Sequence, residues 1–227
     1  MSSLSRALVA IVFVVSASFA GTAPVQAQGF AVAAQAGTAG VGGGVVLGLT
    51  SRLNVRTMYG FIPGDPPFTI DDIDFSLSLP SFLLTTVDLF PFGGFRLSGG
   101  GLLITNDDGG LDVVGTFDGR SVVLGATTFT GGPLDQMIGN FSLKRFQPYL
   151  GIGIGNPIGK RIGINFDAGV GFGSTPIVAL TATGPLADLP GSTLDAELQQ
   201  EVADIQADIP EFLKYYPVLS LSVSIGF

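Results

Sequence analysis

The chain ends with the sequence YPVLSLSVSIGF, from Tyr216 to Phe227, in which two kinds of side chain alternate. From Pro217 onward one set is mostly small or polar, and the other is large and apolar: Leu219, Leu221, Val223, Ile225 and Phe227. Successive side chains of a β-strand point to opposite faces, so this segment predicts a strand with one apolar face. Such a strand fits either a soluble sheet, with its apolar face on a core, or a membrane barrel, with that face in lipid.

The composition favours the membrane barrel. Only 12% of the 227 residues are charged, against about 25% in a typical soluble domain, and the mean hydropathy is +0.54. Yet no run reaches the roughly 20 apolar residues that a spanning helix needs. A barrel explains both observations, because its strands alternate apolar with polar residues. The chain has no cysteine, which excludes a disulfide framework.

The N-terminus has the pattern of a secretory signal peptide. Arg6 supplies a positive charge, residues 7–20 are apolar, and Val25-Gln26-Ala27 places small residues where a cleavage site needs them. We therefore expect residues 1–27 to be a signal peptide and residues 28–227 to form the barrel. An uncleaved anchor is the alternative, but the apolar segment is short for a span. Export of a membrane barrel implies the outer membrane of a Gram-negative-type cell.

Eight segments of the chain alternate in this way. They cover residues 30–36, 41–49, 53–61, 73–89, 95–105, 146–155 and 162–172 and the C-terminal segment. The connections after the second, fourth and sixth segments are short, and those after the third, fifth and seventh are long. Outer-membrane barrels have an even number of strands, short periplasmic turns and longer external loops. The sequence therefore predicts an all-β, antiparallel up-and-down barrel of eight strands, with an irregularity at Pro80 and with both termini in the periplasm.

Residues 106–145 leave an alternative open. Two turn signals, Asp108-Gly109-Gly110 and Asp118-Gly119, flank β-prone runs in this connection. The runs form either a hairpin outside the membrane or two further barrel strands, which would make ten.

The longest connection, residues 173–215, contains a predicted helix. Apolar residues recur there at spacings of three or four over residues 193–209. Ser192 or Thr193 is placed to cap the helix, and Pro210 to end it. We expect its apolar side to pack on neighbouring loops, and a plug in the barrel is the alternative.

The alternation also directs four charged side chains into the barrel: Arg56, Asp88, Arg96 and Asp167. An isolated buried ion is costly, so two positive and two negative groups are expected to pair. The interior of an eight-stranded barrel is just filled by side chains. We therefore expect an ion network near the periplasmic turns that stabilises the barrel, with Asn54 and Asn165 nearby. A conducting or gated pore is the alternative.

The remaining acidic residues predict an acidic external face. Of the 18 acids, 16 lie in or beside the three long connections, whereas Arg52, Lys160 and Arg161 lie in short turns. Solvated loops that resist aggregation explain this distribution, and cation bridging to lipopolysaccharide phosphates is the alternative. The sequence NDDGGLD at residues 106–112 offers oxygen ligands but lacks the spacing and final glutamate of an EF-hand, so we expect no metal and no cofactor.

Enzymatic and nucleic-acid functions are disfavoured. The chain has no histidine, so the Ser/His and Asp/His arrangements of hydrolases cannot form. A paired-carboxylate hydrolase would have only Asp88 and Asp167 in the lumen, both expected to pair with arginine. The net charge of −8 disfavours nucleic acid. The glycine-rich residues 37–44 lack the Lys-Ser/Thr of a phosphate loop. We expect no catalytic residues.

Three stretches resemble the small Gram-negative outer-membrane barrels of the OmpA/OmpW-like group. They are PYLGIGIGN at residues 148–156, FDAGVGF at residues 166–172 and the terminal strand. In that group the barrel-assembly machinery recognises a C-terminal strand that ends in phenylalanine. The resemblance therefore implies an insertion signal made of Phe227, Ile225, Val223 and Leu221.

The sequence leaves several functions open. We expect a monomeric outer-membrane barrel with a structural or surface-interaction role, namely membrane integrity or contacts with lipid, lipopolysaccharide or external partners. The alternative is a passive pore for small or apolar solutes. A soluble periplasmic β-barrel binder is less favoured.

Overall fold

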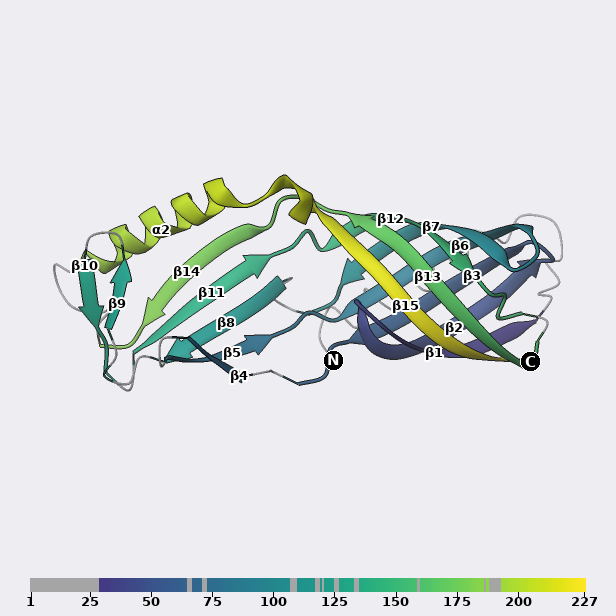
Figure 1. Cartoon of the computed structure of the whole chain (residues 1–227), viewed down its shortest axis with the longest axis horizontal. Helices are drawn as coiled ribbons and strands as arrows, with labels where there is room; N and C mark the ends of the chain where they lie inside the picture. Colours follow the sequence, from purple (N-terminus) through teal and green to yellow (C-terminus); the bar gives the residue numbers. More distant parts are fainter. Residues whose placement is uncertain are drawn as a thin grey trace, which may run out of the picture.

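The computed structural model describes residues 29–64, 67–70, 73–106, 110–116, 119, 121–124, 127–132, 135–158, 160–185, 187 and 193–227. The expected signal peptide lies outside the described residues. The described chain forms a closed barrel and an extension of two smaller sheets and a helix, which continues beyond one end of the barrel (Figure 1). None of the helices in these residues is long and apolar enough to cross a membrane.

Eight antiparallel strands form the barrel. They are β1 (Phe30–Gly37), β2 (Gly40–Thr50), β3 (Leu53–Phe61), β6 (Phe82–Phe92), β7 (Phe95–Ile104), β12 (Phe146–Ile154), β13 (Ile162–Phe172) and β15 (Tyr215–Gly226). Neighbours in this list pair with each other, and β15 closes the ring by pairing with β1 as well as β13. The prediction of an eight-stranded up-and-down barrel is confirmed, and the ten-stranded alternative is wrong.

The long connections build the extension. Its five-stranded sheet has the order β14-β11-β8-β5-β4, and β9 pairs with β10 in a separate hairpin. The bounds of these strands are β4 (Pro67–Ile70), β5 (Ile73–Ser78), β8 (Gly110–Thr116), β9 (Ser121–Leu124), β10 (Thr127–Thr130), β11 (Gln136–Ser142) and β14 (Ile177–Thr183). The helix α2 (Leu194–Asp208) and the 3₁₀ helix η1 (Glu211–Lys214) then lead into β15.

Two expectations about the long connections are corrected. The fourth predicted strand, residues 73–89, is two strands: β5 belongs to the extension and β6 to the barrel. Pro80 lies in the break between them, where its missing N–H cannot weaken a ladder. The strand β14 was not predicted within residues 173–215, because its sequence IVALTAT alternates only weakly.

The helix α2 lies along the extension, as expected for a loop element and not for a plug of the barrel (Figure 1). Its buried residues Leu194 and Leu198 pack with Phe129 of β10. The side-chain amide of Gln206 accepts a hydrogen bond from the Val178 N–H and donates one to the Pro176 carbonyl. Thr193 occupies the N-cap position, but its side chain makes no capping hydrogen bond.

The two faces of the barrel strands differ as the alternation predicts. In β15 the side chains of Leu219, Leu221 and Val223 are exposed, whereas Ser220 and Ser222 are buried. Among the described side chains, nearly all exposed large apolar residues lie on barrel strands or at the C-terminus; the exceptions are Ile177, Phe212 and Leu213. The barrel therefore presents an apolar outer wall, and its polar residues face inward.

Candidate functional site

The barrel interior holds an ion network made of Arg56 on β3, Asp88 on β6, Arg96 on β7 and Asp167 on β13. Arg56 Nε lies 3.0 Å from Asp88 Oδ2, and Arg56 Nη1 lies 2.9 Å from Asp167 Oδ2. Arg96 Nε donates to Asp167 Oδ1 at 3.1 Å. Asp167 therefore lies between two guanidinium groups. Because β3 and β13 occupy opposite positions in the ring, the Arg56–Asp167 pair spans the lumen.

Other groups in the lumen add hydrogen bonds to this layer. Thr86 Oγ1 donates to Asp88 Oδ1 at 2.9 Å, and Arg96 Nη1 donates to the Gly155 carbonyl at 2.8 Å. All four charged residues are at most 4% exposed, and their formal charges cancel. Breaking a buried ion pair by removing one partner typically destabilises a protein by about 3–5 kcal/mol, because it leaves a buried charge unpaired. The network therefore links β13 to β3, β6 and β7, which are adjacent to one another in the ring.

The structure brings together the four lumen residues that the alternation identified, close to the short turns. Asn54 and Asn165 flank them but bond elsewhere: Asn54 Nδ2 donates to Asn156 Oδ1 at 3.2 Å, and Asn165 Nδ2 to Ser224 Oγ at 3.1 Å. Thr86 was missed, because a threonine at an inward position carries no signal beyond the alternation itself.

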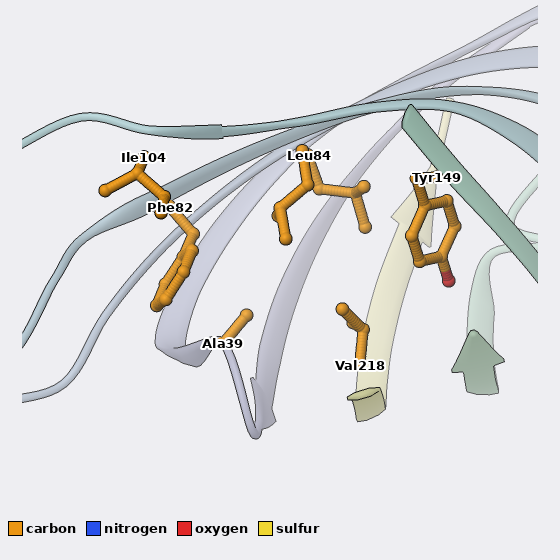
Figure 2. Packing of buried hydrophobic residues seen from close by; sticks show 7 residues of the cluster. Ala39, Phe82, Leu84, Ile104, Tyr149 and Val218 are labelled. Carbon is orange, nitrogen blue, oxygen red and sulfur yellow. The ribbon is translucent and has the colours of Figure 1, made fainter. Parts of the chain in front are cut away.

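A second layer of buried apolar side chains lies in the lumen nearer the extension (Figure 2). Phe82 begins β6, Ile104 ends β7 and Ala39 lies in the link between β1 and β2, so the layer lies at the end opposite the short turns. Its members are buried and come from four strands and this link: Ala39, Phe82, Leu84, Leu102, Ile104, Tyr149 and Val218. This layer was not predicted from the sequence, although Val218 on the small face of the last strand was a signal for it.

Interior glycines make room for the largest lumen side chains. A methyl group at Gly151 would lie 2.4 Å from Tyr149 Oη, and one at Gly169 would lie 2.3 Å from it. At Gly153 a methyl group would lie 2.6 Å from Arg96 Nε. These positions on β12 and β13 therefore require glycine because the ring of Tyr149 and the guanidinium of Arg96 occupy the space.

The acidic residues predicted to lie outside the membrane are only partly described. In the extension, Asp112 accepts a hydrogen bond from Asn140, and Asp135 Oδ2 accepts one from the Gly132 N–H at 2.7 Å. Within the described ranges, no group of three or more acidic residues is arranged to hold a metal ion. The central part of NDDGGLD and several other predicted acids lie outside the described residues: Asp65, Asp71, Asp72, Asp107, Asp108, Asp118 and Asp188.

Aromatic pairs mark both ends of the barrel's outer wall. At the short-turn end, Phe30 stacks on Phe227 with ring centroids 4.8 Å apart. At the extension end, Phe172 and Tyr215 meet edge to face at 5.8 Å. Aromatic girdles of this kind flank the apolar band of transmembrane barrels at both membrane interfaces.

Comparison with known proteins supports this architecture. No protein-family model matches the chain, and no curated protein matches its sequence. The solved structure of CarO from Acinetobacter baumannii matches with a TM-score of 0.54 and 21% identity, over 91% of this chain and 100% of CarO. The chain has the fold of outer-membrane β-barrel proteins.

Two further solved structures match this barrel protein. CarO2 from Acinetobacter baumannii has a TM-score of 0.53 and 19% identity, over 89% of this chain and 100% of CarO2. A major outer membrane protein from Thermus thermophilus has a TM-score of 0.40 and 14% identity, over 88% of this chain and 98% of that protein. The CarO and CarO2 similarities confirm the fold that the resemblance to small outer-membrane barrels implied.

Proposed function

We propose that the protein is a closed outer-membrane barrel with a structural or surface-interaction role. It supports membrane integrity and presents its extension to lipopolysaccharide or external partners. The observation that carries this proposal is the lumen, which buried side chains fill in two layers: the ion network and the apolar cluster. A barrel filled in this way serves as an anchor and a scaffold more readily than as a passage.

Several features support the membrane location. The barrel strands are 8 to 12 residues long, and a transmembrane strand needs about 9–11. Their outer wall is apolar and bordered by aromatic residues, as lipid requires. The N-terminal signal pattern supports export. With the short turns in the periplasm, the extension lies outside the cell.

Solute flux into liposomes tests the closed lumen. The mature chain, residues 28–227, is refolded into liposomes, and swelling is followed with small sugars and amino acids. We expect swelling at the rate of protein-free liposomes, because Arg56–Asp167 spans the lumen and the apolar cluster lies above it. Rapid swelling by folded protein would instead support the passive pore.

The same preparation tests membrane insertion. We expect the mature chain to need detergent or lipid, since its outer wall exposes many large apolar side chains. A mature chain that stays folded and soluble in buffer alone would support the periplasmic binder instead.

We also propose that the protein has no enzymatic activity. The sequence contains no histidine, and the lumen carboxylates of Asp88 and Asp167 are held by arginines. Assays for phospholipase, protease and glycosidase activity on the refolded barrel test this, and turnover that disappears in Asp88→Asn would contradict it.

A further inference from the structure

Three exposed apolar side chains lie where the barrel meets the extension. Among the described side chains, Ile177, Phe212 and Leu213 are the large apolar residues that are exposed without lying on a barrel strand or at the C-terminus. Ile177 begins β14 and is 65% exposed, whereas Phe212 and Leu213 lie on η1 and are 67% and 45% exposed. We call these three residues the junction patch. Neither of the buried apolar clusters in the described chain includes them.

Hydrogen bonds hold the two segments of the junction patch in the same sector of the barrel rim. The side chain of Gln206, in α2, accepts from the Val178 N–H and donates to the Pro176 carbonyl, so it binds both neighbours of the first residue of β14. Beyond the end of β13, the Gly173 N–H donates to the Lys214 carbonyl of η1 at 2.8 Å. The start of β14 and η1 therefore lie together between the barrel and α2 (Figure 1).

The junction patch directly continues the apolar outer wall of the barrel. The pairing of β13 with β15 ends at Phe172 and Tyr215, and the first residue of η1 lies four positions before Tyr215. The 12 residues of β15 span about 30 Å of membrane, at about 3.4 Å per residue and a tilt of about 45°. This length matches the hydrocarbon core, which is about 30 Å thick and is flanked by head-group layers of about 5–8 Å. The segment that follows the wall therefore lies at the depth of the head groups.

The charged residues of η1 neutralise each other beside the apolar ones. Lys214 Nζ lies 3.0 Å from Glu211 Oε2, and it lies 5.4 Å from the centroid of the Tyr215 ring. A segment with phenylalanine and leucine exposed and no net charge is suited to the boundary between head groups and acyl chains. The exposed carboxylate of Asp208, at the end of α2, favours water instead. The surface suited to lipid is therefore confined to the junction patch and does not continue along α2.

We propose that the junction patch inserts into the outer leaflet of the membrane and contacts the upper part of its acyl chains. This inference rests on the proposed membrane location and adds to it a lipid contact made by the extension itself. Continuity with the apolar wall of the barrel argues for hydrocarbon as the occupant of the patch. The contact fixes the base of the extension at the membrane surface, from which β14 and α2 lead away.

Single-tryptophan variants test the depth of the junction patch, because the chain has no tryptophan of its own. The mature chain with Phe212→Trp is refolded into phosphatidylcholine vesicles whose acyl chains carry bromine either near the head group or near the methyl end. We expect the tryptophan emission to fall most with bromine near the head group, because an interfacial side chain enters this boundary by about 5–10 Å. Leu213→Trp serves as a second reporter of the same patch. Heat-modifiable migration on gels confirms that each variant retains the barrel.

Two further variants calibrate the measurement. Phe166 lies in the middle of β13 on the outer wall and is 48% exposed, so Phe166→Trp is expected to lose most emission with bromine near the methyl end. Gln199 is exposed on α2 in the extension, so Gln199→Trp should keep its emission in both brominated lipids. Acrylamide, which stays in the water, is expected to quench Gln199→Trp strongly and Phe212→Trp weakly.

Two results would overturn the proposal. If acrylamide quenches Phe212→Trp as strongly as Gln199→Trp and brominated lipid does not quench it, the junction patch faces water. If neither quencher reaches Phe212→Trp, protein covers the patch, as in an association with a second copy of the chain. A folded Phe166→Trp that brominated lipid fails to quench would instead contradict the membrane location, so the two failures are distinguishable.

Discussion

Asp167 is the residue on which the lumen network depends most, because it accepts hydrogen bonds from both Arg56 and Arg96. We expect Asp167→Ala to lower the free energy of unfolding by about 3–5 kcal/mol, since it leaves buried guanidinium charge unpaired. Urea unfolding in lipid vesicles, followed by circular dichroism, measures this change. The control Asp195→Ala removes an exposed acid at the start of α2 and should change stability by less than about 1 kcal/mol. Equal effects would show that the network does not stabilise the barrel.

The contact between Tyr149 and Gly151 gives a second prediction. Among the described residues, the buried Tyr149 hydroxyl has no hydrogen-bond partner, so Tyr149→Phe is expected to be neutral or slightly stabilising. Gly151→Ala is expected to destabilise the barrel by about 1–3 kcal/mol, because the methyl group would overlap the hydroxyl. The double variant should recover part of that loss, because it removes the nearest clashing atom. A double-mutant cycle without coupling would contradict this packing.

For single residues, the alternation of apolar and polar side chains predicted which residues face the lumen. It did not predict how those side chains pack against one another there. Arg56 and Asp167 were identified as partners because both are charged and both point inward. Tyr149 was not identified, because its packing over Gly151 and Gly169 depends on the register of β12 against β13. Such cross-strand contacts follow from strand pairing and not from the local sequence.

The strand β15 is the element that closes the barrel. Phe227 stacks on Phe30, and its N–H donates to the Phe30 carbonyl at 2.8 Å. We predict that deleting Phe227 lowers the amount of heat-modifiable barrel in outer-membrane fractions, because the resemblance to small outer-membrane barrels implies that the terminal residue is an insertion signal. Phe30→Ala is the matched control, since it removes the same stacking but keeps the C-terminal residue. An equal fall in Phe30→Ala would assign the effect to the seam and not to the signal.

The helix α2 should stabilise the extension independently of the barrel. Leu198 is 3% exposed and packs in the cluster with Phe129 and Leu194. We expect Leu198→Ser to make the extension sensitive to protease while the barrel remains heat-modifiable, since the cluster shares no residue with the lumen layers. Exposed Asp195→Asn is the control. Loss of the whole barrel in Leu198→Ser would show that the two parts fold as one unit.

Elements of the barrel were easier to predict than those of the extension. Barrel strands face lipid on one side and the lumen on the other, so their alternation is strong, as in β13. The extension strands face neither lipid nor the barrel lumen. Their apolar residues, such as Val113 and Ile138, are therefore half-buried. Their pattern is weak for that physical reason, which is why β14 was missed and β5 was joined to β6.

For the whole molecule, the structure combines a barrel whose buried lumen charges cancel with an acidic extension. The ion network near the short turns and the apolar cluster near the extension lie at two levels of one lumen. The pairing of β15 with β1 leaves no open seam in the ring of eight strands. The sequence could predict the barrel and its paired ions, but the apolar cluster at a second level of the lumen became evident only from the folded structure.

Single-channel recording in planar bilayers tests the central claim, a closed barrel, most directly. The refolded mature chain is added at increasing concentration, with an open porin as a positive control for the bilayer. We predict a silent membrane at both polarities, because Arg56–Asp167 spans the lumen below a layer of packed apolar side chains. Reproducible, concentration-dependent openings from protein that gel migration shows to be folded would contradict this account.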